Sequence, residues 1–391
     1  MTAWPRVTAL VERAVKVGPL PGALACIGHG DAPPQVIARG TRGRGLPGAP
    51  GADTLFRLFS MTKPVTGLLA AMLIDEGRIG LDQPLADILP MFAAPRVAID
   101  PQAGLDSRPA RAAITIRHLL THTSGLGYGG LDDAVSRHLV AAGALPSRFP
   151  RRGMPGLAPF PPTLDAEGFL AAAAAAPLMA DPGTAWHYAM GLDVLGLAIA
   201  RVLGQGLDAA LRERLFDPLG MVDTGFTARR DDGGRMTDMD FIAVSPPVTI
   251  DGAGDSAWHD PPAFPFGGAG LIGTPRDYDR FLNMLAGGGA LDGVRVMRPE
   301  AVALATSDLL PPGIEPHGLA SGYGFGAGGA VGRGARAGEF GWYGASGIRG
   351  FVDLRRRLRA VLFSQFMPFE ALDLFEAFPQ AVRDDWEENS G

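Results

Sequence analysis

The chain has very little lysine and cysteine. Of its 35 basic residues only Lys16 and Lys63 are lysines, and the others are arginines. Cys26 is the single cysteine, so an intramolecular disulfide and a cysteine metal cluster are both excluded. Positive charge is also in deficit, because the net charge is −6 at pH 7, which argues against nucleic acid as the main partner.

Long apolar runs are absent as well. The apolar stretch at residues 168–180 is too short to cross a bilayer and contains Pro177. Residues 1–18 form an amphipathic helical pattern without the apolar segment of a signal peptide. We therefore expect a cytoplasmic protein with no membrane partner.

The length of 391 residues allows two domains, or one large domain with an insertion. Residues 22–28 and 35–40 are predicted as strands, and alternating apolar residues near the C-terminus predict more. These C-terminal strands are expected at 323–326, 339–345, 349–354 and 358–365, with 267–272 opening another. The sequence predicts an α/β domain made of residues 1–80 and 261–391, which carries a helical insertion at 81–260.

Helices are expected in the insertion and at both ends of the chain. Residues 116–121 and 191–203 have helical patterns. A final helix is expected at 370–386, interrupted by Pro379. The loop at 142–162 is rich in proline, and it is expected to be either a stiff surface loop or a lid over the substrate pocket.

The scarcity of lysine draws attention to Lys63. It stands three residues after Ser60, where an apolar helical pattern begins and runs to about Asp75. Residues i and i+3 share one face of a helix, so the Lys63 amine is expected beside the Ser60 hydroxyl. Lysine can give up its proton when its surroundings lower its pKa, whereas arginine cannot, and a Ser-x-x-Lys pair is a common way to activate a serine nucleophile. The pair also arises by chance on solvated helices, but the apolar residues that follow Lys63 indicate a core helix.

Five segments in order resemble one enzyme family. They are residues 56–63, 114–126, 182–188, 267–271 and 341–344. Together they resemble serine hydrolases of the β-lactamase-related superfamily, and most of all the family VIII carboxylesterases, which share the fold of class C β-lactamases and penicillin-binding proteins. The resemblance covers about residues 19–365. It implies a β-lactamase-like α/β fold, in which helices and a large helical insertion flank an antiparallel sheet and the active site lies at the interface of the two domains.

The resemblance also implies catalytic roles. Ser60 would attack the acyl carbon, and Lys63 and Tyr188 would share the proton transfer, with Tyr188 kept partly deprotonated by Lys63. The backbone N–H groups of Ser60 and Ala345 would form the oxyanion hole. No cofactor and no metal are implied.

Two positions depart from the lactamase pattern. Met190 stands where lactamases and penicillin-binding proteins carry an asparagine that contacts the substrate amide. Trp342 replaces the lysine of the Lys-Thr-Gly strand, which reads Trp342-Tyr343-Gly344 here. An apolar residue in place of that cation favours uncharged esters over substrates with a carboxylate.

Two further residues modify this substrate prediction. Arg349 follows the segment 342–344 closely and would restore some positive charge, so a β-lactam remains a possible substrate. Tyr343 stands where the esterases usually carry glycine, and its larger side chain is expected to narrow the pocket. Trp342, Tyr343, Gly344 and Met190 are thus the expected substrate-binding residues.

Competing signals are weaker. His118 and His122 have the spacing of a zinc-binding helix, but Leu119 takes the place of the glutamate and no third ligand is evident. Ser256 follows Gly254-Asp255 as in one lipase motif, but it is expected in a loop.

The sequence thus predicts a serine esterase that acts on short- to medium-chain carboxylic esters through an acyl-enzyme. The alternatives are a β-lactamase, a D-amino-acid peptidase or an acyltransferase on the same scaffold, and a non-catalytic protein similar to penicillin-binding proteins. The oligomeric state is left open.

Overall fold

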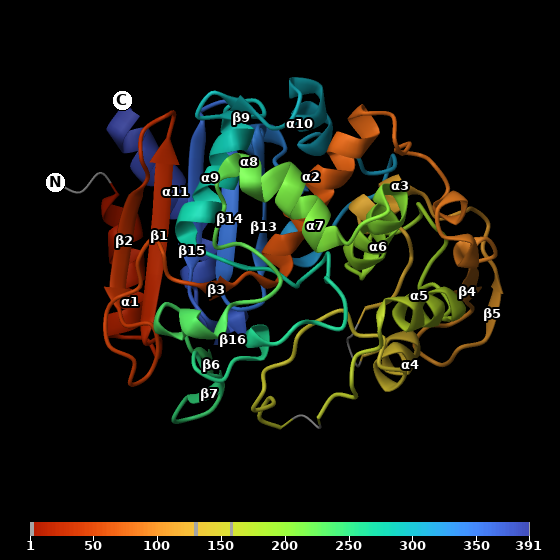
Figure 1. Cartoon of the computed structure of the whole chain (residues 1–391), viewed down its shortest axis with the longest axis horizontal. Helices are drawn as coiled ribbons and strands as arrows, with labels where there is room; N and C mark the ends of the chain where they lie inside the picture. Colours follow the sequence, from red (N-terminus) through yellow and green to blue (C-terminus); the bar gives the residue numbers. More distant parts are fainter. Residues whose placement is uncertain (1–3, 129–131, 157–158, 391) are drawn as a thin grey trace.

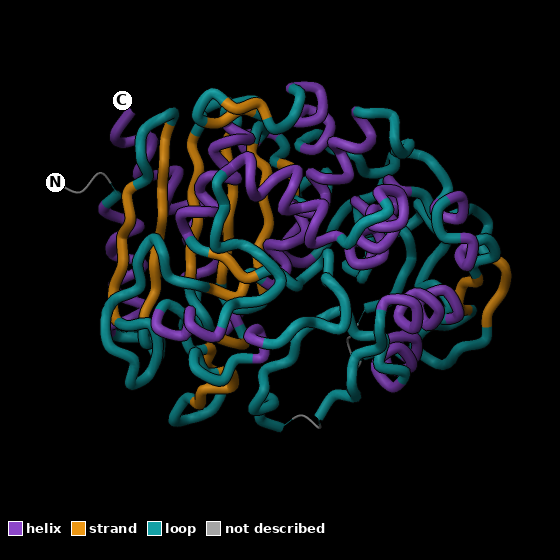
Figure 2. The backbone as a smooth tube through the Cα atoms, viewed as in Figure 1, coloured by secondary structure: helices purple, strands orange, loops and turns teal. Residues whose placement is uncertain are grey.

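A computed structural model of the chain describes residues 4–128, 132–156 and 159–390. A large sheet with its helices forms one side of the molecule, and smaller helices joined by long loops form the other (Figure 1). Most of the strands gather on the first side, and the first and last described residues lie at its outer edge (Figure 2).

The large sheet has seven strands in the order β11-β12-β13-β14-β15-β1-β2, and all neighbours are antiparallel. In chain order they are β1 (Gly22–His29), β2 (Gln35–Gly40), β11 (Gly324–Phe325), β12 (Ala330–Val331), β13 (Glu339–Gly344), β14 (Ile348–Asp353) and β15 (Leu358–Phe363). Most of the expected strands are confirmed. The central strands β1 and β15 bury side chains on both faces of the sheet, because their apolar runs are nearly continuous. In β1, for example, Leu24 and Cys26 join one core cluster while Ala23 and Ala25 join another.

Helices cover both faces of this sheet. α1 and α11 pack together on one face, and α2, α9 and α10 belong to the core on the other. The helices are α1 (Pro5–Lys16), α2 (Thr62–Asp75), α3 (Ile116–Leu120), α4 (Ala134–Ala141), α5 (Ala166–Ala175), α6 (Gly191–Leu203), α7 (Leu207–Leu211), α8 (Asp217–Leu219), α9 (Pro275–Ala286), α10 (Pro299–Ala305) and α11 (Leu374–Ser390).

The remaining strands are short. They are β3 (Phe56–Arg57), β4 (Arg96–Ala98), β5 (Ser107–Pro109), β6 (Met239–Phe241), β7 (Val248–Asp251), β8 (Ile272–Gly273), β9 (Ala290–Leu291), β10 (Val294–Arg295) and β16 (Phe366–Met367). β6 pairs in parallel with β16, so part of the segment expected as an insertion is joined to the C-terminal strands. The division into two domains stays a prediction.

The expected α/β fold with its antiparallel sheet is confirmed, and three local expectations change. Of the segment 267–272, only Ile272 lies in a strand, β8, and the glycines at 267 and 268 form a turn. α11 continues through Pro379, because Phe378 and Val382 hold it against the sheet with fully buried side chains. The N-terminal helix begins at Pro5, and residues 1–3 lie outside the described part.

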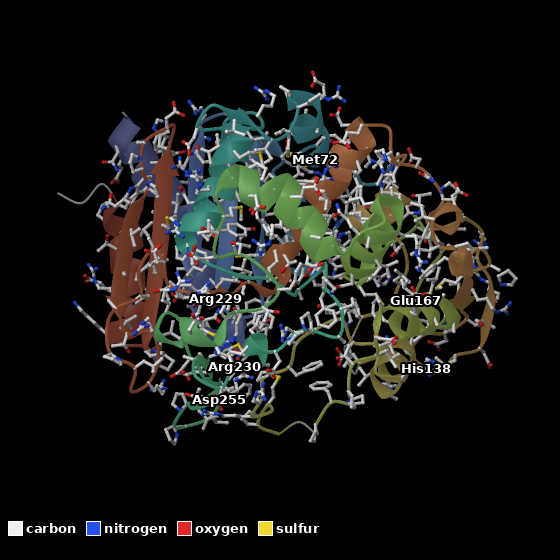
Figure 3. The ribbon with its side chains drawn as sticks, viewed as in Figure 1. Met72, His138, Glu167, Arg229, Arg230 and Asp255 are labelled. Carbon is white, nitrogen blue, oxygen red and sulfur yellow. The ribbon has the colours of Figure 1, made fainter. Side chains whose placement is uncertain are left out.

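Helix α2 positions the site. Its C-terminal part, marked by Met72, lies at the upper edge in Figure 3, and its N-terminal end points into the middle of the molecule, between the sheet and α6. In the described part of the chain no single helix is long and apolar enough to cross a membrane, and the one pair that passes this test together, α6 with residues 207–219, is bent by 82°.

Candidate active site

Ser60 and Lys63 meet at the start of α2. Ser60 lies in a short 3₁₀ turn, Phe59–Met61, that leads directly into the helix. The Lys63 side chain is fully buried, and its Nζ lies 3.1 Å from Ser60 Oγ. Burial lowers the pKa of Lys63 to about 8, because a charged amine loses its hydration there. The structure thus brings together a hydroxyl and an amine that can lose its proton near neutral pH.

The segment before Ser60 is held rigidly. Arg57 is fully buried, and its guanidinium forms an ion pair with Asp251 at 2.6 Å and donates to Thr237 O and Gln365 Oε1. Phe59 has a φ of 41°, a conformation that costs energy for a residue other than glycine. These contacts fix the backbone at the point where it presents Ser60.

Tyr188 lies in the loop before α6, and its hydroxyl forms hydrogen bonds with both Ser60 and Trp342. It accepts a hydrogen bond from Trp342 Nε1 at 3.1 Å and also bonds with the Ser60 hydroxyl. The Lys63 Nζ lies 4.6 Å from the centre of the Tyr188 ring. Burial raises the pKa of Tyr188 far above its ordinary value, so the structure favours the neutral phenol at neutral pH rather than the partly ionised form that the resemblance implied.

His122 fixes the Tyr188 loop. The backbone N–H of Ala189 donates to His122 Nδ1 at 3.2 Å, and the N–H of His187 donates to the His122 carbonyl at 2.8 Å. The ring is fully buried, and burial together with the charge of Lys63 lowers the pKa of His122 well below its ordinary value. His122 is therefore neutral and holds the two residues on either side of Tyr188.

Trp342 contributes more than an apolar surface. It is nearly buried among Trp186, Phe325 and Tyr188, which form an aromatic wall. Its indole N–H donates to Tyr188, so it takes part in the hydrogen bonding around Ser60. The sequence predicts the loss of the lysine cation at this position, but not this new donor.

Gly344 and Ala345 lie close to the Ser60 segment. A Cβ atom on Gly344 would come within 2.6 Å of Leu58 O, so only glycine allows β13 to approach this closely. On the other side of Ala345, Ser346 Oγ donates to Arg57 O at 3.2 Å. The oxyanion-hole role of Ala345 stays a prediction, and its neighbours hold it beside the turn that carries Ser60.

Two expected substrate-binding residues make packing contacts, and their role in binding substrate stays a prediction. Met190 is fully buried in the main core, which favours a packing role behind Tyr188. Tyr343 contacts Phe369 and Phe375, on the side of α11. Arg349 pairs with Tyr343 across the strands and lies over Phe375 on that same side, so it does not take the place of the missing lysine beside Tyr188.

The sequence reasoning missed two polar residues beside Lys63. Asp193 is buried in the first turn of α6, five residues after Tyr188. Its signal in the sequence is a lone acidic residue in an otherwise apolar helix start. Tyr128, two residues after the motif at 114–126, presents its ring 5.8 Å from the Lys63 Nζ and contacts the Tyr188 ring edge-on.

The competing sites are occupied by structural contacts. Ser256 is fully buried, and its hydroxyl bonds with Asp251 and Arg57. His118 caps its own helix by accepting the Thr115 N–H, and no cluster of metal-binding side chains occurs within the described residues.

The proline-rich loop at 142–162 is anchored through Arg148 to Phe226 and Trp258. Arg148 donates to Phe226 O at 2.7 Å and lies over the Trp258 ring. The loop borders a cavity of about 610 Å³ together with β7. Residues 157 and 158 lie outside the described part, and the role as lid or surface loop stays a prediction.

Comparisons with known proteins show which family the chain resembles. A family model described as Beta-lactamase matches residues 7–379. The esterase EstB of Burkholderia gladioli is 34% identical over 389 residues, which cover 92% of this chain and 89% of EstB. Protein Rv1367c of Mycobacterium tuberculosis is 39% identical over 259 residues, or 66% of this chain, and the match spans only 60% of that relative's length. A solved structure described as EstCE1, a hydrolase with promiscuous acyltransferase activity, has a TM-score of 0.78 at 26% identity and covers 98% of both chains.

Proposed function

The chain belongs to the beta-lactamase family, and from this premise we propose that it is a serine esterase that hydrolyses short- to medium-chain carboxylic esters through an acyl-enzyme on Ser60. The observation that supports this most is the buried Lys63 amine, 3.1 Å from Ser60 Oγ, with a pKa lowered to about 8. A buried lysine of this kind is an effective base for a serine hydroxyl near neutral pH.

The proposed reaction follows from the contacts around Ser60. Ser60 Oγ attacks the carbonyl carbon of the ester while its proton passes to the neutral amine of Lys63. Tyr188, which bonds with Ser60, passes a proton to the leaving alkoxide, so that the alcohol departs and an acyl-Ser60 ester remains. Water then attacks this ester, and the same groups return the protons. The N–H groups of Ser60 and Ala345 stabilise the oxyanion, a contribution of about 3 kcal/mol for each such donor.

The aromatic wall supports an ester with no charge near the reacting carbonyl. Trp342 and Tyr188 close the place where lactamases present a cation, and a carboxylate buried there would lose its hydration without gaining an ion pair. Uncharged esters avoid this cost.

Chemical labelling tests the nucleophile. A fluorophosphonate is expected to add one equivalent of mass, located on Ser60 by peptide mapping, and Ser60→Ala should remove both labelling and ester hydrolysis. Ser124 and Ser256 are fully buried, and a label on either would refute the proposed site.

Acyl transfer to an alcohol is the second candidate. Trp186 and Trp342 form an apolar cluster with Tyr188 beside Ser60, which favours an organic acceptor over water, and EstCE1 is described as having acyltransferase activity. With a chromogenic ester as donor, added alcohol should yield the new ester at the expense of free acid if transfer occurs. Free acid as the sole product at all alcohol concentrations would exclude it.

A further inference from the structure

Asp193 is a buried carboxylate that the proposed reaction does not yet use. It is the third residue of α6, is 1% exposed, and follows directly on the fully buried Leu192. An ionised carboxylate is costly to bury unless other groups compensate its charge. Its position beside the reacting groups therefore needs an explanation.

The backbone of a single residue, Gly268, joins Asp193 to Lys63. The N–H of Gly268 donates to Asp193 Oδ1 at 2.8 Å, and the carbonyl oxygen of the same residue accepts from Lys63 Nζ at 2.8 Å. The two charged side chains form no direct ion pair in the described part of the chain, and Asp193 Oδ2 has no hydrogen-bond partner there. Asp193 thus contacts the turn that holds the base, and not the base itself.

The glycine-rich segment at 267–271 gains a role from this arrangement. A Cβ atom on Gly268 would lie 2.4 Å from Asp193 Oδ2, and one on Gly267 would lie 2.5 Å from Leu192 O. Only residues without a side chain allow the turn to lie on the start of α6 while its carbonyl points at Lys63.

Among the described residues, the groups that face Lys63 and Asp193 carry no competing charge. Burial raises the pKa of Asp193, and the positive charge of Lys63 opposes that rise. For Lys63 the effects are reversed, because burial lowers its pKa and the negative charge of Asp193 raises it. Tyr128 and Tyr188 are held neutral because burial raises the pKa of each, and His122 is neutral because burial lowers its pKa. Asp193 is therefore the main countercharge that Lys63 experiences.

We propose that Asp193 is a positioning residue for the reaction at Ser60. Its carboxylate fixes the backbone of Gly268, whose carbonyl holds the Lys63 amine against Ser60, and its charge acts on that amine across this residue. The inference rests on the proposed function of Lys63 as the base. It requires that loss of the Asp193 charge change both the proton affinity of Lys63 and the rate of ester hydrolysis.

The chain has two lysines, which makes the first requirement directly measurable. Protein labelled with ¹³C at the lysine Cε gives one signal for Lys63 and one for Lys16, whose side chain is 68% exposed and serves as internal reference. In Asp193→Asn the titration of Lys63 is expected to move to lower pH by at least about half a unit, because a favourable charge has been removed. The titration of Lys16 should not move.

Asp277→Asn is the matched control. Asp277 is also the third residue of its helix, is fully buried, and accepts a backbone N–H from a distant loop, that of Asp223, at 2.8 Å. It should lose stability as Asp193→Asn does but keep the Lys63 titration and kcat of the wild type. A Lys63 titration that is unchanged in Asp193→Asn, or that moves equally in Asp277→Asn, overturns the proposal.

Ester hydrolysis gives the second readout. Asp193→Asn is expected to lower kcat by about 10-fold or more, with the acid limb of the pH profile moved to lower pH in step with the Lys63 titration. If this variant does not fold, Asp193→Glu takes its place, since it keeps the charge and displaces the Gly268 contact, and a wild-type kcat in that variant overturns the proposal. The Lys63 titration requires no ester hydrolysis, so it tests the role of Asp193 independently of the esterase proposal. Full activity of Ser60→Ala would refute the esterase proposal alone.

Discussion

At the scale of single residues, Lys63 has the most narrowly defined requirement, because its side chain must lose a proton. Lys63→Arg keeps a positive charge of similar reach but cannot act as a base. We expect kcat/KM for a p-nitrophenyl ester to fall by roughly 10³-fold. Lys16→Arg changes the only other lysine of the chain, which is exposed, and should behave as the wild type. Appreciable activity in Lys63→Arg would show that Lys63 is not the base.

The burial of Lys63 also predicts a pH dependence. Its pKa is lowered to about 8, and the protonated form that dominates below this value cannot accept the Ser60 proton. Activity should therefore rise with pH through about 8 and level off above it, measured as kcat/KM after subtraction of spontaneous hydrolysis. A profile that is flat between about pH 6 and about pH 10 would contradict this assignment.

Tyr188 and Lys63 should act as one unit. They share Ser60 as their neighbour, so removing either interrupts the same proton transfer. Lys63→Ala and Tyr188→Phe are each expected to cost roughly 10³-fold in kcat, and the double variant should be little worse than either. Tyr323→Phe is the control, because the Tyr323 ring lies against Arg336 and has no contact with Ser60 or Lys63 among the described residues. If the two losses multiply, the residues act independently, and a mild effect of Tyr188→Phe would remove it from the mechanism.

At the scale of elements, the two terminal helices depend on one buried carboxylate. Asp385 of α11 accepts the backbone N–H groups of Arg6 and Val7 at 3.1 and 3.0 Å, and so caps the start of α1 from the far end of the chain. Asp385→Asn should destabilise the protein by about 1–3 kcal/mol and lower Tm, because a buried acceptor for these donors is weakened. Asp384 is the partly exposed neighbour of Asp385, and Asp384→Asn should leave Tm nearly unchanged in the same thermal melt. Equal melting temperatures for both variants would show that the cap adds little stability.

The elements also show what a sequence can predict. Strands such as β13 and β15 and helices such as α2 and α6 follow from local apolar periodicity, and the Ser60–Lys63 contact follows from helical spacing alone. The cap by Asp385 joins residues 378 positions apart, and no local pattern contains it. The strand expected to open at 267–272 begins only at Ile272 for a related reason, since Gly267 and Gly268 are set by their contact with α6 rather than by their neighbours in the chain.

At the scale of the whole molecule, the site is assembled from segments across most of the chain. α2 supplies Ser60 and Lys63, the loop before α6 supplies Tyr188, and β13 supplies Trp342. The sequence predicts each residue type, but the Trp342 N–H bond to Tyr188 depends on packing between distant elements. Because of this hydrogen bond, Trp342, which we expect to select the substrate, also takes part in the hydrogen bonding of Tyr188 and Ser60.

That wall predicts the choice of substrate. A cephalosporin carries a carboxylate, and beside Trp342 and Tyr188 it would meet aromatic surface instead of the cation that lactamases present. Arg349 lies on the α11 side of the sheet, over Phe375, and does not supply that charge beside Tyr188. An ester also has a better leaving group than an amide. We therefore expect kcat/KM for a chromogenic short-chain ester to exceed that for a chromogenic cephalosporin by roughly 10²-fold or more on the same preparation.

The control for this last prediction uses the cation that remains nearby. Arg349→Ala should leave the preference for esters unchanged, because Arg349 faces away from the reacting groups. Comparable turnover of the cephalosporin by the wild type would refute the argument from Trp342. If Arg349→Ala then abolished that turnover and spared ester hydrolysis, the carboxylate would be reaching Arg349 past Tyr343, and the substrate class would extend to anionic acyl compounds.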